Sequence, residues 1–173
     1  VLRQSAPTLI AAVAMTLVIT TGGIDLSVGS TLAIVSALSA IALQAGSPWW
    51  LAVLAMLLVG AGVGLVNGWF VAYERIPAFI VTLAMLSIVR GVALLITQGY
   101  SIPVAPESPF VAIGRGSFLG FPIPALLAIV AAFTGHIVLT QTRFGQYITG
   151  VGANMEAVRR SGVSTRRVLL RVY

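Results

Sequence analysis

The stretch TGGIDLSVGS, residues 21–30, places an acid, glycines and hydroxyls between two strongly apolar runs. AAVAMTLVIT precedes it and TLAIVSALSAIAL follows it. Residues 6–43 are 38 positions long, whereas one helix crosses the hydrocarbon core with about 20 apolar residues. The length therefore favours two short membrane helices, over 6–20 and 31–43, rather than one broken helix. The predicted turn between them contains Gly22, Gly23, Asp25, Ser27 and Gly29.

The depth of Asp25 in the membrane stays open from sequence. Two crossing helices put Asp25 near the cytoplasmic face and Arg3 outside, whereas one broken helix puts Asp25 nearer the midplane. Its carboxylate can cap the helix that begins near Leu26 or Ser27 by accepting free N–H groups. It can also bind a cation or substrate, as broken helices do in transporters. The two roles are compatible, and we favour the cap.

The composition is that of an integral membrane protein. The 173 residues are 58% hydrophobic and only 8% charged, whereas roughly a quarter of the residues of a soluble domain are charged. Three further runs are long enough to span: Trp49–Tyr73, Ile76–Gln98 and Ile123–Gln141. We therefore expect an all-α, polytopic transmembrane helical bundle with about five membrane segments. Because the chain starts at Val1 without Met, residues 1–173 are expected to be part of one larger transmembrane domain.

The arginines predict the orientation. Between the spans, residues 101–122 are too rich in Pro and Gly for a membrane helix and predict a surface loop. Six arginines follow the last span, against one acid there, and cytoplasmic loops carry the excess of basic residues. Residues 142–173 are therefore expected to be a basic cytoplasmic loop. Topology explains the net charge of +6 better than nucleic-acid binding does.

Several enzyme classes lack their residues in this chain. All ten basic residues are Arg, so a P-loop has no Lys for the phosphates. Without Cys there is no thiolate site, and one His cannot form a metal cluster. We therefore expect no catalytic site and no cofactor.

Polar and small residues within the spans are candidates for helix contacts. Gly60, Gly64 and Gly68 form one small face, where helix backbones can approach closely. Intrachain packing is the preferred interpretation, and a second subunit is the alternative. The intramembrane polar candidates are Asn67, Arg90 and His136. Arg90 is either a functional charge or a structural tie, and His136 favours a helix–helix hydrogen bond over a proton relay.

The tail contains a short amphipathic helix over Met155–Ser161, with Asn154 as its N-cap and Gly162 as its stop. Glu156 near its start and the arginines near its end suit the helix dipole. It is either a helix lying on anionic lipid or a docking helix that receives force from a soluble partner.

Three motifs in one order resemble the ribose-type permeases, the membrane subunits of bacterial ABC importers for simple sugars. They are TGGIDLSVGS at 21–30, VNGWFVAYERIPAFIVTLAMLSIVRGVALLITQG at 66–99 and the tail from 142 to 173. The tail is similar to the family's G-x-N-x-x-A-A-x-x-S-G-I pattern and to the EAA-x-x-x-G coupling pattern, through Asn154, Glu156, Ala157 and Gly162. Val158 and Arg160 depart from these patterns: Val158 is a modest change in a docking helix, whereas Arg160 bears on which ATPase fits.

The resemblance implies a translocation subunit in the bacterial inner membrane, with a coupling helix around 153–162. It implies as partners an ATP-binding cassette subunit, a periplasmic substrate-binding protein and a second permease subunit, identical or different, in the lipid bilayer. The substrates would be simple sugars or related small polar solutes. The alternative is a secondary transporter driven by H⁺ or Na⁺, with Asp25 as the ion ligand and Arg90 as a counter-charge.

Overall fold

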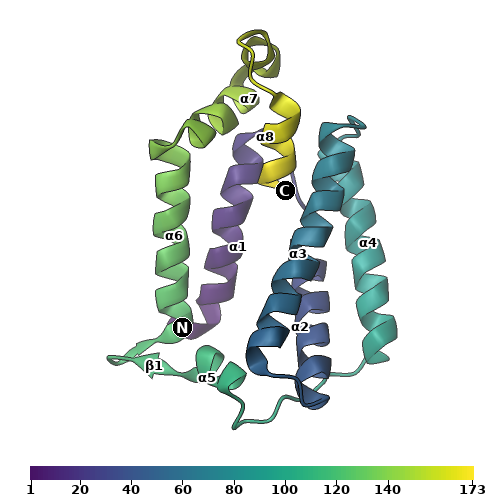
Figure 1. Ribbon diagram of the computed structural model, residues 1–173, viewed down its shortest axis with the longest axis vertical. Coiled ribbons are helices and arrows are strands. Elements are labelled where there is room, and N and C mark those ends of the chain that lie inside the picture. Colours follow the sequence, from purple (N-terminus) through teal and green to yellow (C-terminus); the bar gives the residue numbers. More distant parts are fainter.

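A computed structural model describes residues 1–173 as eight helices and one small hairpin (Figure 1). The helices are α1 (Leu2–Thr20), α2 (Val28–Gln44), α3 (Trp49–Ala72), α4 (Ala78–Thr97), α5 (Pro109–Arg115), α6 (Ile123–Gln141), α7 (Arg143–Arg160) and α8 (Thr165–Val172). The hairpin pairs β1 (Ser117–Phe118) with β2 (Phe121–Pro122) in antiparallel register. The predicted all-α class is confirmed.

Four helices, α1, α3, α4 and α6, are long and apolar enough to cross a membrane. The fifth, α2, is apolar but has only 17 residues, a rise of about 25 Å at 1.5 Å per residue. Two separate helices thus flank the opening stretch, as predicted. Because polar residues can extend a helix beyond the hydrocarbon core, α1 begins at Leu2, four residues before the predicted start.

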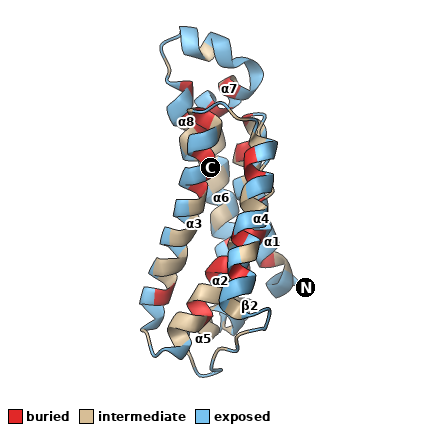
Figure 2. Ribbon diagram, turned by 90° about the vertical axis from the view of Figure 1, so that its right-hand side faces the viewer, coloured by how far each residue is buried: buried red, intermediate tan, exposed pale blue.

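The helices form two groups that α7 and α8 bridge at one end (Figure 1). In one group α1 packs along α6, and in the other α2 packs against α3 and α4. Only 26 residues are buried, and most of the outer surface of the helices in Figure 2 is exposed or half-buried. Exposed apolar side chains are what spans present to lipid or to further transmembrane helices.

The two ends of the bundle differ in charge. Segments α7 and α8 and the α3–α4 loop gather at one end, called the α7 end, while α5, the hairpin and the N-terminus lie at the other, the α5 end (Figure 1). Seven of the ten arginines belong to segments of the α7 end. The alternating direction of α1 to α4 agrees with the predicted order of crossings.

Two loop segments contain more structure than predicted. Residues 101–122 form no spanning helix, as expected, but they fold into α5 and the hairpin. Residues 143–153 are helical although Gly145, Gly150 and Gly152 lie among them. The glycines are needed there because Gly145 and Gly152 lie against backbone carbonyls of α6 and α1. Beyond Gly162, α8 turns back along α3, where the sequence predicts only loop.

Candidate functional site

Gly22 ends α1 and starts the turn. Its φ of +82° is left-handed, a conformation that glycine adopts without the penalty of a Cβ. The Gly22 N–H donates to the Ile19 carbonyl at 2.9 Å, and the Gly23 N–H donates to the Val18 carbonyl at 3.2 Å. This pair of bonds is a Schellman motif, which satisfies two free carbonyls at the end of the helix.

Asp25 fixes the start of α2. Its Oδ1 accepts hydrogen bonds from the Ser27 N–H at 2.7 Å and from the Ser27 hydroxyl at 2.6 Å. Ser27 is the N-cap of α2, and its carbonyl accepts the first helical bond, from Thr31 at 2.8 Å. Asp25 therefore stabilises the start of α2, as predicted. Its carboxylate does so through the N-cap residue Ser27, which precedes the helix, rather than through an N–H group inside the helix.

Side chains of α3 and α4 hold the turn below the α7 end. Asn67 Nδ2 donates to Ser27 Oγ at 2.9 Å. The Thr82 hydroxyl shares its one proton between the Ala78 carbonyl at 2.9 Å and the Ile24 carbonyl at 3.1 Å. Asn67 and Thr82 are fully buried. Asn67 lies five residues before the end of α3, which at 1.5 Å per residue puts it about 7.5 Å inside. Asn67 and Thr82 thus hold the turn inside the bundle, towards its α7 end.

The small face of α3 receives α8. A Cβ added at Gly68 would lie 3.0 Å from the Leu170 carbonyl oxygen, and one at Gly64 would overlap the Tyr173 carbonyl. The predicted intrachain packing is confirmed for these two glycines. Gly60, on the same face, has nothing within 4 Å of the position of a Cβ. Its surface is open within this chain.

The predicted helix at the α7 end is capped at both ends. Asn154 leaves helical geometry, with φ −159° and ψ 93°, and its Oδ1 accepts the Ala157 N–H at 3.0 Å. After the helix, Gly162 adopts φ +86°. The N–H groups of Gly162 and Val163 bond to the carbonyls of Arg159 and Val158, again a Schellman motif. The N-cap and the stop are confirmed, and we name residues 155–160 the capped helix.

A charged cluster lies on the exposed side of the capped helix. Glu156 accepts two hydrogen bonds from Arg159, both at 2.8 Å, and one from Arg160 Nε at 3.0 Å. The bonds from Arg159, and then the bond from Arg160, lower the pKa of Glu156 from 4.5 to about 2. The carboxylate is therefore ionised at neutral pH. Because all three side chains are largely exposed, the cluster shapes the surface more than it stabilises the fold.

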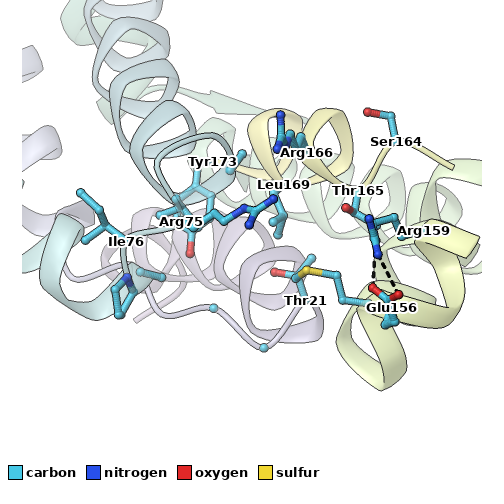
Figure 3. A pocket seen from close by; sticks show the side chains of 17 residues that line it. Thr21, Arg75, Ile76, Glu156, Arg159, Ser164, Thr165, Arg166, Leu169 and Tyr173 are labelled. Carbon is cyan, nitrogen blue, oxygen red and sulfur yellow. Dashed lines mark hydrogen bonds and ion pairs between the residues drawn. The ribbon is translucent and has the colours of Figure 1, made fainter.

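A cleft of about 810 Å³ separates the capped helix from the turn. Its walls come from the turn, the α3–α4 loop, the capped helix and α8. Figure 3 shows Arg75 reaching across the cleft from the α3–α4 loop, with the Glu156–Arg159 pair on the opposite side. The Arg166 guanidinium lies 5.9 Å from the ring centre of Tyr73, within cation–π range. Three arginines and one acid give this cleft a positive surface.

The remaining intramembrane candidates lie apart from this cleft. Arg90 lines a smaller cleft of about 430 Å³ between α2 and α4. The side chains of Arg90 and His136 are exposed and form no hydrogen bond or ion pair within the chain. The helix–helix bond expected of His136 is thus not made between these helices, and the role of Arg90 stays a prediction.

Two residues that contact the turn were not predicted. Thr82 lies in a stretch that carries the resemblance, and its hydroxyl on an apolar helix was a usable signal. Tyr173, whose hydroxyl is buried against Gly23, follows a basic run with no distinctive pattern. Its position depends on α8 folding back along α3, which no local sequence pattern predicts.

These features define a polytopic, all-helical membrane protein with a polar turn inside the bundle and a capped surface helix at its basic end. The chain belongs to the family described as branched-chain amino acid transport system / permease component, which matches residues 1–173. With its four apolar helices, this membership makes the chain part of a multi-pass protein of the bacterial inner membrane.

Relatives within the family are named for sugars. The chain is 38% identical over 175 residues to the fructose import permease protein FruF of Bifidobacterium longum, covering 99% of this chain and 49% of that protein. It is 38% identical over 176 residues to the ribose import permease protein RbsC of Escherichia coli, covering 100% of this chain and 55% of that protein. The chain spans about half the length of the curated relatives it matches. No solved structure matches it.

Proposed function

We propose that the chain is part of the permease subunit of an ATP-binding-cassette importer for simple sugars or related small polar solutes. In this proposal the spans form part of the translocation pathway, and a separate subunit hydrolyses ATP. The observation that carries it is the capped helix, which ends in defined caps, exposes its charged side and borders the cleft that leads to the turn.

We infer that the α7 end is cytoplasmic. Seven of the ten arginines belong to that end, and cytoplasmic loops carry the excess of basic residues. The capped helix then faces the compartment that holds ATP, and we infer that it is the coupling helix. The sequence pattern around Glu156, Ala157 and Gly162 and the names of the relatives support this role.

The complete transporter in this proposal contains two permease subunits, the ATPase and a periplasmic substrate-binding protein. Since the binding protein selects the solute before the permease meets it, the relatives' names support the sugar class rather than one sugar. The ion-driven alternative is less favoured, because both hydrogen bonds to Asp25 Oδ1 come from Ser27 of the same turn.

The test uses the full-length permease purified with its ATPase and binding protein and reconstituted in vesicles. ATP hydrolysis and uptake are measured against a panel of monosaccharides. We expect one of these sugars to stimulate ATP hydrolysis, and Glu156→Ala to reduce uptake per ATP while the subunit still inserts. Uptake that persists without the ATPase, driven by an ion gradient and abolished by Asp25→Asn, would instead establish the secondary transporter.

A further inference from the structure

The helix α8 and Tyr173 pack against a surface formed by α3 and the turn. Leu170 lies against Gly68, and the Tyr173 carbonyl lies against Gly64, so α8 contacts the small face of α3 without intervening side chains. At the end of α8 the Tyr173 hydroxyl lies against Gly23. A Cβ at any of these three glycines would meet α8 or Tyr173.

The capped helix and α8 form one unit. The link between them is only Ser161–Ser164, and its direction is set by the Schellman motif at Gly162. One buried cluster joins the first part of α7, α8 and the end of α3: Ile148, Val151, Val168, Leu169 and Ala72. Val158 of the capped helix and Val163 of the link pack against this cluster. Because packed interiors transmit strain, a displacement of the capped helix reaches Tyr173 through Val158 and α8.

On the far side of Tyr173, the turn is connected to four helices. Gly23 follows the end of α1, Ile24 is held by Thr82 of α4, and Ser27 starts α2 while it is held by Asn67 of α3. The turn is thus the joint between the two groups of helices. A shift of Gly23 changes the position of the start of α2 relative to α1.

We propose that Tyr173 is a positioning residue that links the capped helix to the turn and so sets the start of α2. The inference rests on the proposed function, because it takes residues 155–160 as the coupling helix. The Tyr173 hydroxyl is buried without a hydrogen-bond partner. The contact with Gly23 therefore depends on shape, and Tyr173→Phe removes no hydrogen bond to another residue of this chain.

This geometry yields a rescue experiment. A Cβ at Gly23 would overlap the Tyr173 hydroxyl oxygen, while the ring carbon Cζ lies at 3.4 Å, an ordinary contact. It would also lie 3.2 Å from Val18 Cγ1, a tight contact that the single and the double variant share. Gly23→Ala therefore pushes Tyr173 away, and Tyr173→Phe removes the atom in conflict. Gly29→Ala is the matched control, since nothing lies within 4 Å of a Cβ there.

The assay measures uptake per ATP hydrolysed in vesicles that contain the full-length permease, its ATPase and its binding protein. We expect this ratio to fall severalfold in Gly23→Ala, to stay normal in Tyr173→Phe and Gly29→Ala, and to recover in the Gly23→Ala/Tyr173→Phe double variant. A purely structural role would lower uptake and hydrolysis together. A normal ratio in Gly23→Ala, or no recovery in the double variant, overturns the inference.

A second variant covers the case in which Gly23→Ala does not insert. Tyr173→Ala creates no overlap, and we expect it to hydrolyse ATP with little uptake. A normal ratio in Tyr173→Ala overturns the inference. Failure of the proposed function has a different signature: the wild-type complex then shows no ATP-driven uptake, which refutes both. An uncoupled Glu156→Ala with a normal Gly23→Ala refutes only the inference.

Discussion

Alanine substitutions along the small face of α3 test how closely α8 packs on it. At Gly64 the added Cβ would lie 3.0 Å from the Tyr173 carbonyl carbon and would overlap the oxygen. At Gly68 it would lie 3.0 Å from the Leu170 carbonyl oxygen, 3.1 Å from its Cα and 3.2 Å from its Cδ1. At Gly60 it would meet nothing within 4 Å. The three substitutions therefore differ only in what the new methyl group contacts.

The difference in stability follows from two effects. Forcing an extra carbon into a packed site costs about 1–3 kcal/mol. Alanine favours a helix over glycine by about 1 kcal/mol, a gain that all three variants share. Relative to Gly60→Ala, we expect Gly64→Ala to lower the free energy of unfolding by about 1–3 kcal/mol. Gly68→Ala should lie between them, since Leu170 can shift by a few tenths of an ångström.

The measurement is the free energy of unfolding of the full-length permease in mixed micelles, by titration with SDS. Gly60→Ala is the reference because it shares the helix, the face and the substitution. Values for all three variants that agree to within about 0.5 kcal/mol, the spread of surface substitutions, would show that α8 does not pack on this face.

Three further outcomes concern the turn and the capped helix. Ser27→Ala removes the hydrogen bonds of the Ser27 hydroxyl with Asp25 and Asn67. At about 0.5–1.5 kcal/mol for each bond, we expect the free energy of unfolding in the same SDS titration to fall by about 1–3 kcal/mol. An unchanged free energy of unfolding would contradict this hydrogen-bond network. Asn154→Ala removes the N-cap bond, worth about 0.5–2 kcal/mol, so amide hydrogen exchange should quicken in residues 155–160 and not in 143–153. The pKa of Glu156 is lowered from 4.5 to about 2, so the stabilisation from its ion pairs with Arg159 and Arg160 is full above pH 4.5 and is lost as pH falls through 2. NMR of the Glu156 carboxyl carbon should therefore give a titration midpoint near 2. A midpoint near 4.5 would contradict the charged cluster.

Features set by local sequence were predictable. Length and hydropathy give the spans, and α6 has the predicted bounds because Pro122 and Thr142 flank it. Asn154 and Gly162 were recognised as caps because capping depends on side chains and φ angles within one turn. Asp25 was likewise recognised as a capping residue, because its bonds reach only two residues along the chain.

Features set by contacts distant in sequence were not predictable. The position of α8 depends on packing between Leu170 and Gly68, about a hundred residues apart. The small face of α3 could be identified, but nothing in the sequence pattern indicated that α8 packs on it. Asn67 was a candidate only because it is polar within a span, whereas its bond to Ser27 depends on how α2 and α3 pair.

The most direct test of coupling through residues 155–160 compares two glycines with the same local geometry. Gly162 and Gly46 both end a helix in a Schellman motif, with φ of +86° and +80°, and a Cβ at either meets nothing within 4 Å. Alanine costs roughly 1–2 kcal/mol in this conformation, so both variants carry similar strain, at the α7 end and the α5 end respectively.

In vesicles containing the full-length permease, its ATPase and its binding protein, sugar uptake per ATP hydrolysed is measured for both. We expect Gly162→Ala to reduce the ratio and Gly46→Ala to leave it at the wild-type value. Equal ratios in the two variants would contradict coupling through the capped helix.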